Sequence, residues 1–169
     1  MADLRAFFAA APLGSFAGTV YRVCPARYGR NMLSMRGAFL HGARYNIREY
    51  FGALYTSLSA DTARREMARY YTVPPIGGFV EAAIQVRLSR VADLTNQHLL
   101  RKAGMRREEL IDDQHHVTQE AGLRAWESGV EGLVAPSAAH STERNMVLFL
   151  DNQEPGWRIE FRSLRPWSR

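Results

Sequence analysis

The sequence predicts a single α+β domain in which short helices accompany mixed, mostly antiparallel sheets. Three observations support this fold class. The chain has 169 residues, a length that favours one domain. Strand-like and helix-like segments are interspersed, and the helix-like ones are short. The clearest late strands, at 145–150 and 157–163, are separated by a turn at Pro155 and Gly156, as antiparallel neighbours are.

The composition is that of an ordinary globular protein. Hydrophobic residues make up 46% and charged residues 23%, so a chain of this size needs no disulfide or metal for stability. Cys24 is the only cysteine, which excludes an internal disulfide and suits a reducing cytoplasm. The apolar run at 7–13 is short for a signal peptide, and no stretch approaches the roughly 20 apolar residues of a membrane span. We therefore expect a cytoplasmic protein without membrane contact.

The formal net charge of +5 comes almost entirely from arginine, since Lys102 is the only lysine. A basic balance suits an anionic partner such as a nucleic acid, a nucleotide or an acidic protein. Many small soluble proteins are mildly basic, however, and GC-rich coding also enriches arginine. The charge alone therefore leaves the function open.

The first predicted elements are a helix at 3–10 and a strand at 18–23, in which Arg22 shares a face with Val20. The segment 25–37 is rich in arginine and glycine and is expected to be irregular.

The central elements are a strand at 53–57 and a helix at 60–71, with Ser59 as the predicted N-cap. The apolar face of this helix consists of Ala60, Ala63, Met67 and Tyr70. Three arginines are expected to point away from that face: Arg64, Arg65 and Arg69. Glu66 falls on the border between the two faces, where a charge lies at a rim or faces a cleft.

Farther along, residues 80–88 alternate between apolar and polar, which predicts a strand with a solvated face that includes Glu81. Thr118 and Gly129 are the expected N-cap and stop of a helix. The other elements expected in this half are short helices, the longer helix just named and a buried strand: 95–102, 106–112, 118–127 and 132–135.

Several common chemistries lack their motifs. There is no G-x-G-x-x-G motif, Walker loop or G-x-S-x-G elbow. His115 and His116 are adjacent and lack H-E-x-x-H spacing, and one cysteine cannot build a zinc cage. We therefore expect neither a metal site nor a tightly bound cofactor.

Arg44, Tyr55 and Glu66 follow one another at intervals of eleven residues, and each has an ordinary structural explanation. Arg44 can be a solvated loop charge, Tyr55 a half-buried strand residue, and Glu66 the partner of a nearby arginine on a helix surface. Ser137 can be a turn residue in a polar loop. Taken singly, none of them identifies a site.

Taken together, a set of short motifs occurs in one order: 20–23 with Arg22, 41–46, 54–57, Ala63 with Glu66, Pro136 with Ser137, and 145–149. This ordered set resembles the RES domain family, which is named for its arginine, glutamate and serine. The resemblance covers about residues 18–150. The whole chain, 1–169, is expected to form one domain. The usual central run of the family is Gly-Gly-Arg-Trp-Asn, where this chain has Gly-Ala-Arg-Tyr-Asn at 42–46.

The resemblance implies a fold similar to that of ADP-ribosyltransferases and a role as the toxin of a bacterial toxin–antitoxin pair. Family members deplete NAD by cleaving its nicotinamide–ribose bond, by hydrolysis or phosphorolysis, so NAD is a substrate rather than a cofactor. The implied partner is an Xre-type helix-turn-helix antitoxin, with a homo-oligomer formed through that complex. No direct contact with nucleic acid is expected.

The resemblance also assigns roles to individual residues. Glu66 is expected to stabilise positive charge on the ribose as nicotinamide leaves. Arg22 and Arg44 are expected to bind phosphate from neighbouring strands, with Arg44 counted as catalytic. Tyr55, also counted as catalytic, and Tyr45 are expected to stack on nicotinamide.

Ser137 and Asn145 complete the expected binding set. Ser137 would bind the nicotinamide amide or a phosphate, and Asn145 would hold the loop that carries Ser137. No general base is assigned, because nicotinamide is a good leaving group.

Two alternatives remain open. The first is a transferase that places ADP-ribose on a protein. The second is a small basic nucleic-acid-binding protein, which the charge and the arginine-flanked tyrosines favour. The spread of arginines along the whole chain counts against the second.

Overall fold

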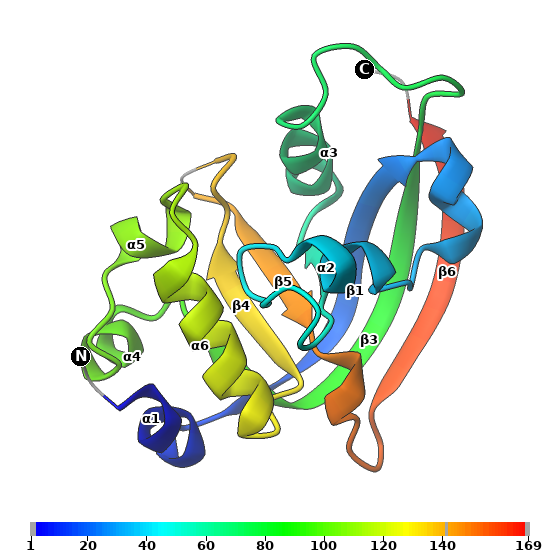
Figure 1. Cartoon of the computed structure of the whole chain (residues 1–169). Helices are drawn as coiled ribbons and strands as arrows, with labels where there is room; N and C mark the ends of the chain where they lie inside the picture. Colours follow the sequence, from blue (N-terminus) through cyan, green and yellow to red (C-terminus); the bar gives the residue numbers. More distant parts are fainter. Residues whose placement is uncertain (1–2, 141, 168–169) are drawn as a thin grey trace.

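The computed structural model describes residues 3–140 and 142–167 (Figure 1). Its strands are β1 (Gly14–Pro25), β2 (Leu54–Ser57), β3 (Phe79–Asp93), β4 (Gly132–Pro136), β5 (Arg144–Leu148) and β6 (Arg158–Trp167). Its α-helices are α1 (Leu4–Ala10), α2 (Arg36–His41), α3 (Ala60–Ala68), α4 (Gln97–Lys102), α5 (Arg107–Ile111) and α6 (His116–Glu127). Two 3-10 turns, η1 (Ala26–Asn31) and η2 (Leu150–Asn152), complete the described elements.

The described strands form one sheet in the order β1-β2-β5-β4-β3-β6, and an additional β1–β3 pairing closes five of them into a ring. Only the β3–β4 pair is parallel among these described pairings; the others are antiparallel. The predicted α+β class with a mixed, mostly antiparallel sheet is therefore confirmed. β1 and β2 meet at the single pair Tyr21↔Ser57, so the ring is thinly joined there.

Two large apolar cores and one small cluster of Val23, Ala63 and Phe79 hold the helices and strands together. One fills the space between the sheet and α1, α5 and α6, and it includes Phe8, Leu110 and Phe149. The other lies within the ring and includes Ile84 and Met146. In Figure 1, α1, α4, α5 and α6 gather on one side, whereas α3 stands apart against β1. The space that α3 borders is where the candidate site lies.

The first elements agree with the sequence in place and differ in length. α1 begins after Asp3, whose side chain accepts hydrogen bonds from the backbone as an N-cap. β1 begins at Gly14, earlier than the predicted strand at 18–23, because it pairs with β3 along almost its whole length. The segment 25–37, predicted to be irregular, contains η1 and the start of α2.

In α3 the predicted N-cap is confirmed, because the Ser59 side chain accepts a hydrogen bond from the Thr62 N–H. The helix ends at Ala68 rather than at 71. Beyond Ala68, the Tyr70 N–H bonds to the Met67 carbonyl, three residues back, which tightens the chain out of the α-helical pattern. The prediction that Tyr70 faces inward is wrong, since 76% of it is exposed.

Glu81 was predicted to face solvent, yet only 2% of it is exposed. β6 lies against this part of β3, and Arg165 of β6 donates from Nε and Nη2 to Oε1 of Glu81 at 2.8 and 2.6 Å. Arg64, predicted to point outward, donates from Nε to Oε2 at 2.7 Å. One buried carboxylate therefore ties α3 and β6 to β3.

We expect Glu81→Gln to lower the free energy of unfolding by about 1.5–3 kcal/mol, because a neutral amide cannot compensate two facing guanidinium groups. Both arginines reach solvent, which keeps the loss below that of a fully buried pair. Urea denaturation measures the change. Asp61→Asn is the matched control, since Asp61 pairs with Arg65 on an exposed helix surface. Equal stabilities of the two variants would contradict the prediction.

In the C-terminal half, α4, α5 and β4 lie where the sequence places them. α6 begins at His116, and the prediction that Thr118 caps it is wrong. Thr118 is buried in the first turn, and its hydroxyl donates to the His115 carbonyl. Gly129 does end the helix, with a φ of 71° just after the C-cap. In the described part of the chain, no helix combines the length and apolar composition needed to cross a membrane.

Candidate functional site

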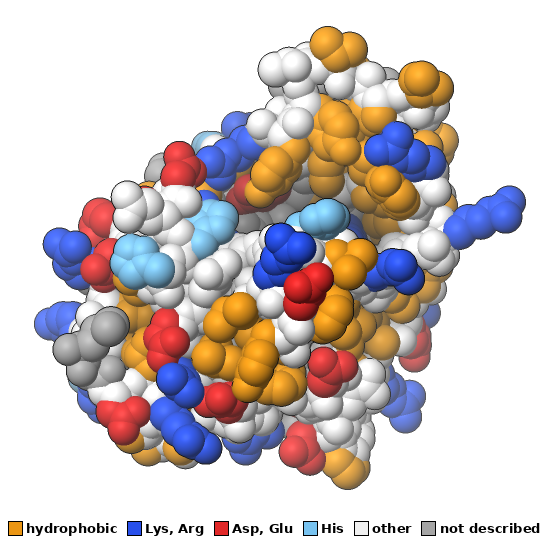
Figure 2. All heavy atoms as spheres, in the orientation of Figure 1, with side chains coloured by type: hydrophobic (Ala, Val, Ile, Leu, Met, Phe, Trp, Pro, Cys, Tyr) orange, Lys and Arg blue, Asp and Glu red, His pale blue; other side chains and the backbone are white. Residues whose placement is uncertain are grey.

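A cavity of about 550 Å³ lies between β1, β2, β5, α3 and the loop that follows α2. Figure 2 shows it as a hollow with apolar, histidine and basic side chains around its mouth. Its volume is typical of small-molecule sites. Its charged lining residues are Arg22, Arg44, Glu66 and Arg69. The cavity therefore combines one carboxylate with three guanidinium groups.

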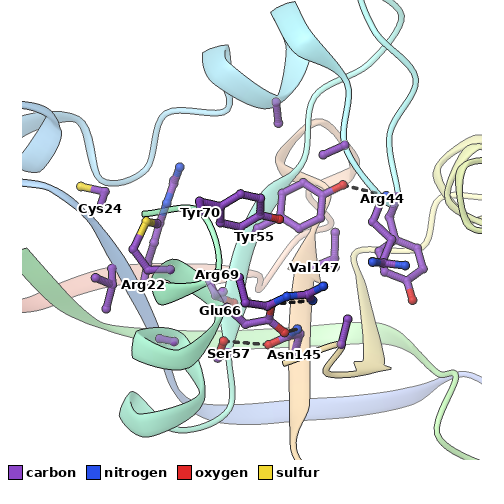
Figure 3. Close-up of a pocket in the computed structure, with 18 of the residues that line it drawn as sticks. Arg22, Cys24, Arg44, Tyr55, Ser57, Glu66, Arg69, Tyr70, Asn145 and Val147 are labelled. Atoms are coloured by element: carbon purple, nitrogen blue, oxygen red, sulfur yellow. Dashed lines mark hydrogen bonds and ion pairs between the residues drawn. The ribbon is translucent and has the colours of Figure 1, made fainter. Parts of the chain in front are cut away.

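Glu66 projects from α3 into this cavity, and its side chain is 21% exposed (Figure 3). Its Oε1 accepts hydrogen bonds from the Ser137 hydroxyl at 2.6 Å and from Nδ2 of Asn145 at 2.7 Å. Its Oε2 lies 3.9 Å from Nη1 of Arg69. One oxygen is thus anchored to the end of β4 and to β5, while the other is left for the cavity.

Ser137 is buried and follows β4 directly. Its hydroxyl accepts from the N–H groups of Ala139 and His140 at 3.0 and 3.2 Å, so its own hydrogen is directed to Glu66. Ser137 is therefore a turn residue that also positions the carboxylate. It is not among the residues that line the cavity, and its direct partner is Glu66 rather than the open space.

Asn145 connects Glu66 to a residue that the sequence reasoning missed. Its Oδ1 accepts a hydrogen bond from the Ser57 hydroxyl at 2.7 Å, and the two residues face each other across the β2–β5 pairing. This contact fixes the amide so that its nitrogen points to Glu66. The available signal was the period of two along β2, which places Ser57 on the same face as Tyr55.

The hydroxyl of Tyr55 holds the turn at 43–46 in place. It accepts from the Tyr45 N–H at 2.8 Å and donates to Oδ1 of Asn46 at 3.0 Å. Burial raises the pKa of Tyr55 above its ordinary value, so the phenol stays protonated and neutral. Its ring lines the cavity, as the predicted stacking role requires.

Asn46 and Gln119 clamp the same turn from the other side. Nδ2 of the buried Asn46 donates to the carbonyls of Ala38 and Phe51 at 2.8 and 3.2 Å. Nε2 of Gln119, from α6, donates to the Ala43 carbonyl at 3.1 Å. The asparagine of the 42–46 run is therefore a structural clamp that fixes Arg44 and Tyr45.

Tyr45 lines the cavity and is only 2% exposed, because its ring belongs to the apolar core beside α6. Burial raises the pKa of Tyr45. No described residue forms a hydrogen bond with its hydroxyl. The ring is a wall of the cavity, and stacking on a ligand stays a prediction.

Arg22 and Arg44 reach the cavity from different kinds of backbone. Arg22 lies in β1, and its Nη1 donates to the carbonyls of Met32 and Ser34 at 2.6 and 3.1 Å. Burial lowers the pKa of Arg22. Arg44 was predicted to lie on a strand next to that of Arg22, and this prediction is wrong. Residues 43–46 form only an isolated bridge.

Arg44 instead satisfies carbonyls at the C-terminal end of α5. Its Nη1 donates to the Leu110 carbonyl at 3.1 Å and to the carbonyl of Asp112. For both Arg22 and Arg44, the described residues offer partners to Nη1 alone. The rest of each planar fork remains available to an anion.

Arg69 and His115 are cavity residues that the sequence reasoning did not place there. Arg69 was predicted to point away from the apolar face, but it follows Glu66 by three residues and therefore shares its side of the helix. His115 is the N-cap of α6. Burial, followed by the charge of Arg44, lowers the pKa of His115 and favours the neutral ring at neutral pH.

All the predicted site residues except Ser137 thus line one cavity. Ser137 lies behind Glu66 and donates a hydrogen bond to it. Within the described residues, no group of three or more His, Cys, Asp and Glu side chains is arranged to hold a metal ion. The arrangement suits a ligand with an anionic group facing the arginines and a positively charged part facing Glu66.

Comparisons with known proteins agree with this picture. A family model described as the RES domain matches residues 19–166. No curated protein matches the chain. A chain in the crystal structure of the M. tuberculosis MbcT–MbcA toxin–antitoxin complex is similar over 98% of this chain and 92% of that one. The TM-score is 0.78 and the identity 22%, so this likeness demonstrates a shared fold.

Proposed function

The chain belongs to the RES domain family, and on that basis we propose that it is the toxin of a toxin–antitoxin pair that cleaves the nicotinamide–ribose bond of NAD. One observation carries the proposal. Glu66 is held rigidly by Ser137 and Asn145 in a cavity whose other charged side chains, among the described residues, are arginines. A negative group fixed in an otherwise cationic cavity suits a substrate that is anionic at one end and cationic at the other.

The charges of NAD match those of the cavity. Its pyrophosphate is anionic, and guanidinium forks bind phosphate oxygens through charge-assisted hydrogen bonds worth about 1.5–3 kcal/mol each. Arg22 and Arg44 are already oriented by backbone carbonyls, so little side-chain freedom is lost when they bind. The pyridinium ring of nicotinamide is cationic and suits the face of Tyr55.

In the proposed reaction, the bond between ribose C1′ and the nicotinamide nitrogen breaks and its electron pair stays on nicotinamide. The ribose becomes oxocarbenium-like, and Oε2 of Glu66 stabilises that positive charge. A preorganised electrostatic contact of this kind is worth about 2.7–4 kcal/mol. Water or phosphate then adds to C1′ and loses a proton to the solvent. Leaving-group protonation is not required, because nicotinamide departs as a neutral molecule.

The decisive experiment incubates the purified chain with NAD and no added protein. We expect free nicotinamide and ADP-ribose in equal amounts, or ADP-ribose phosphate when phosphate is the acceptor. Chromatography of the products distinguishes the two acceptors. NAD that stays intact in the presence of water, phosphate and candidate proteins would refute the proposal.

A transferase that modifies a protein is the second candidate, and exposed apolar side chains after α3 favour it. Tyr70 lines the cavity and is largely exposed, and Val73 and Ile76 in the following segment are exposed as well. Exposed apolar side chains of this kind could contact a target protein. Label from NAD that stays on an added protein, with little free ADP-ribose, would identify this activity.

We further propose that the toxin acts in the cytoplasm, where NAD is available, and that an Xre-type helix-turn-helix antitoxin neutralises it. The similar solved structure is itself a toxin–antitoxin complex, which supports a protein partner. Co-expression with a cognate Xre-type regulator should relieve growth arrest and yield a stable complex on size-exclusion chromatography. Arrest that persists despite a well-expressed regulator would contradict this part.

We expect Ser57→Ala to lower kcat for NAD about tenfold, because Oδ1 of Asn145 loses its donor and the amide can turn its oxygen toward Glu66. Nicotinamide release under saturating NAD measures the effect. Thr19→Val is the matched control, since Thr19 bonds to Gln85 and does not line the cavity. The two variants should have similar melting temperatures, and an unchanged kcat in Ser57→Ala would contradict the positioning role.

A further inference from the structure

Arg69 is held in the cavity differently from the other arginines. Its Nη1 lies 3.9 Å from Oε2 of Glu66, and its Nη2 lies 3.7 Å from Oδ1 of Asp113. Both separations are ion-pair distances and too long for hydrogen bonds. Its side chain is 39% exposed, and it lines the cavity. The guanidinium therefore rests between two carboxylates without being fixed to either.

The groups around it are fixed. Oε1 of Glu66 receives short hydrogen bonds from Ser137 and Asn145, so the carboxylate cannot follow a departing cation. Arg22 and Arg44 are each tied by Nη1 to backbone carbonyls. Among the described residues, Arg69 is thus the cavity arginine without a hydrogen bond, and its whole fork is free to turn. Figure 3 shows Arg69, the residue just after α3, beside Glu66.

We propose that Arg69 is a movable counter-ion that shields Glu66 in the empty cavity and transfers to the substrate's phosphate when the substrate binds. This inference rests on the proposed NAD-cleaving function and specifies how the site is switched on. A phosphate accepts two parallel hydrogen bonds from the fork, which the loose contacts to Glu66 and Asp113 do not provide. Weak, partly exposed ion pairs oppose this transfer very little.

The transfer changes what Glu66 can do. While Arg69 stays beside Oε2, its positive charge opposes the positive charge that develops on the ribose. Once Arg69 has turned to the phosphate, Oε2 faces the sugar with its negative charge unshielded. Phosphate binding therefore increases transition-state stabilisation as well as affinity. Substrates with a phosphate on the ribose should be favoured over the corresponding nucleoside.

The test compares NAD with nicotinamide riboside, which contains the same scissile bond and no phosphate. For Arg69→Ala, we expect the KM for NAD to rise about tenfold while kcat for NAD is kept or increased. For nicotinamide riboside, we expect kcat to rise several-fold, because the shielding cation is gone. ADP-ribose, which cannot react, should bind Arg69→Ala about tenfold more weakly by calorimetry.

Arg65→Ala is the matched control, because Arg65 lies on the same helix, pairs with Asp61 and does not line the cavity. It should match the wild type with all three compounds. Melting temperatures of both variants establish that they fold.

Two outcomes would overturn the inference. One is an equal fall in kcat for both substrates in folded Arg69→Ala, and the other is an unchanged KM for NAD together with unchanged ADP-ribose binding. A wild type that cleaves neither substrate refutes the proposed function instead. ADP-ribose binding then decides separately whether Arg69 contacts a pyrophosphate.

Discussion

Glu66→Gln is expected to reduce NAD cleavage by a factor of 10² to 10³ while the fold and melting temperature remain those of the wild type. The amide oxygen can still accept from Ser137 and Asn145, so the side chain keeps its place. What it loses is the negative charge that would face the ribose. The loss corresponds to about 2.7–4 kcal/mol of transition-state stabilisation. Single-turnover release of nicotinamide measures it, with thermal denaturation as the test of folding.

Glu143→Gln provides the matched control for this variant. Glu143 accepts a hydrogen bond from Thr62 of α3, so it is also a carboxylate next to this helix, but it does not line the cavity. Its turnover should stay within a few-fold of the wild type. A folded Glu66→Gln variant with the turnover of Glu143→Gln would remove the carboxylate from the mechanism.

The second large effect is expected at Gly122, in the middle of α6. A Cβ atom at this position would lie 2.0 Å from the carbonyl oxygen of Tyr45 and 2.7 Å from its carbonyl carbon. The atoms it meets are backbone, so either α6 or the turn at 43–46 must shift. Gly122→Ala should then disturb the contacts of Gln119 and Tyr55 with this turn.

Overpacking of this kind costs about 1–3 kcal/mol, and the better helix propensity of alanine offsets it only in part. In a chain of this size, we expect the melting temperature to fall by roughly 3–8 °C. Circular dichroism during heating measures the shift. Gly37→Ala is the control, because its Cβ meets nothing within 4 Å. Equal melting temperatures for the two variants would refute the close contact.

Local patterns in the sequence predicted most of the elements. The alternation at 80–88 and the cap at Ser59 required no knowledge of distant residues. The alternation lies in β3, and Ser59 caps α3. The error at Glu81 has a distant cause. The residue is buried because β6 lies against it and supplies Arg165, which is 84 residues later in the chain. A charge flanked by apolar residues looks solvated until its partners are known.

The same distinction explains the site. The ordered motifs predicted a shared site for Arg22, Arg44 and Glu66, although each motif is weak alone. All three residues line one cavity. Ser57 was missed because one hydroxyl in a short strand has no pattern of its own. Its importance depends on the β2–β5 register, which places it opposite Asn145.

The buried carboxylate at position 81 gives the two ends of α3 different mechanical properties. Through Arg64, it pins the helix to the sheet just before Glu66, whereas Arg69 lies beyond the end of the helix at Ala68 and has only two long ion-pair contacts. Random mutagenesis should therefore find a sharp gradient along one short segment. Substitutions at Arg64 should impair folding and activity together, whereas those at Arg69 should alter substrate preference in proteins that remain fully folded.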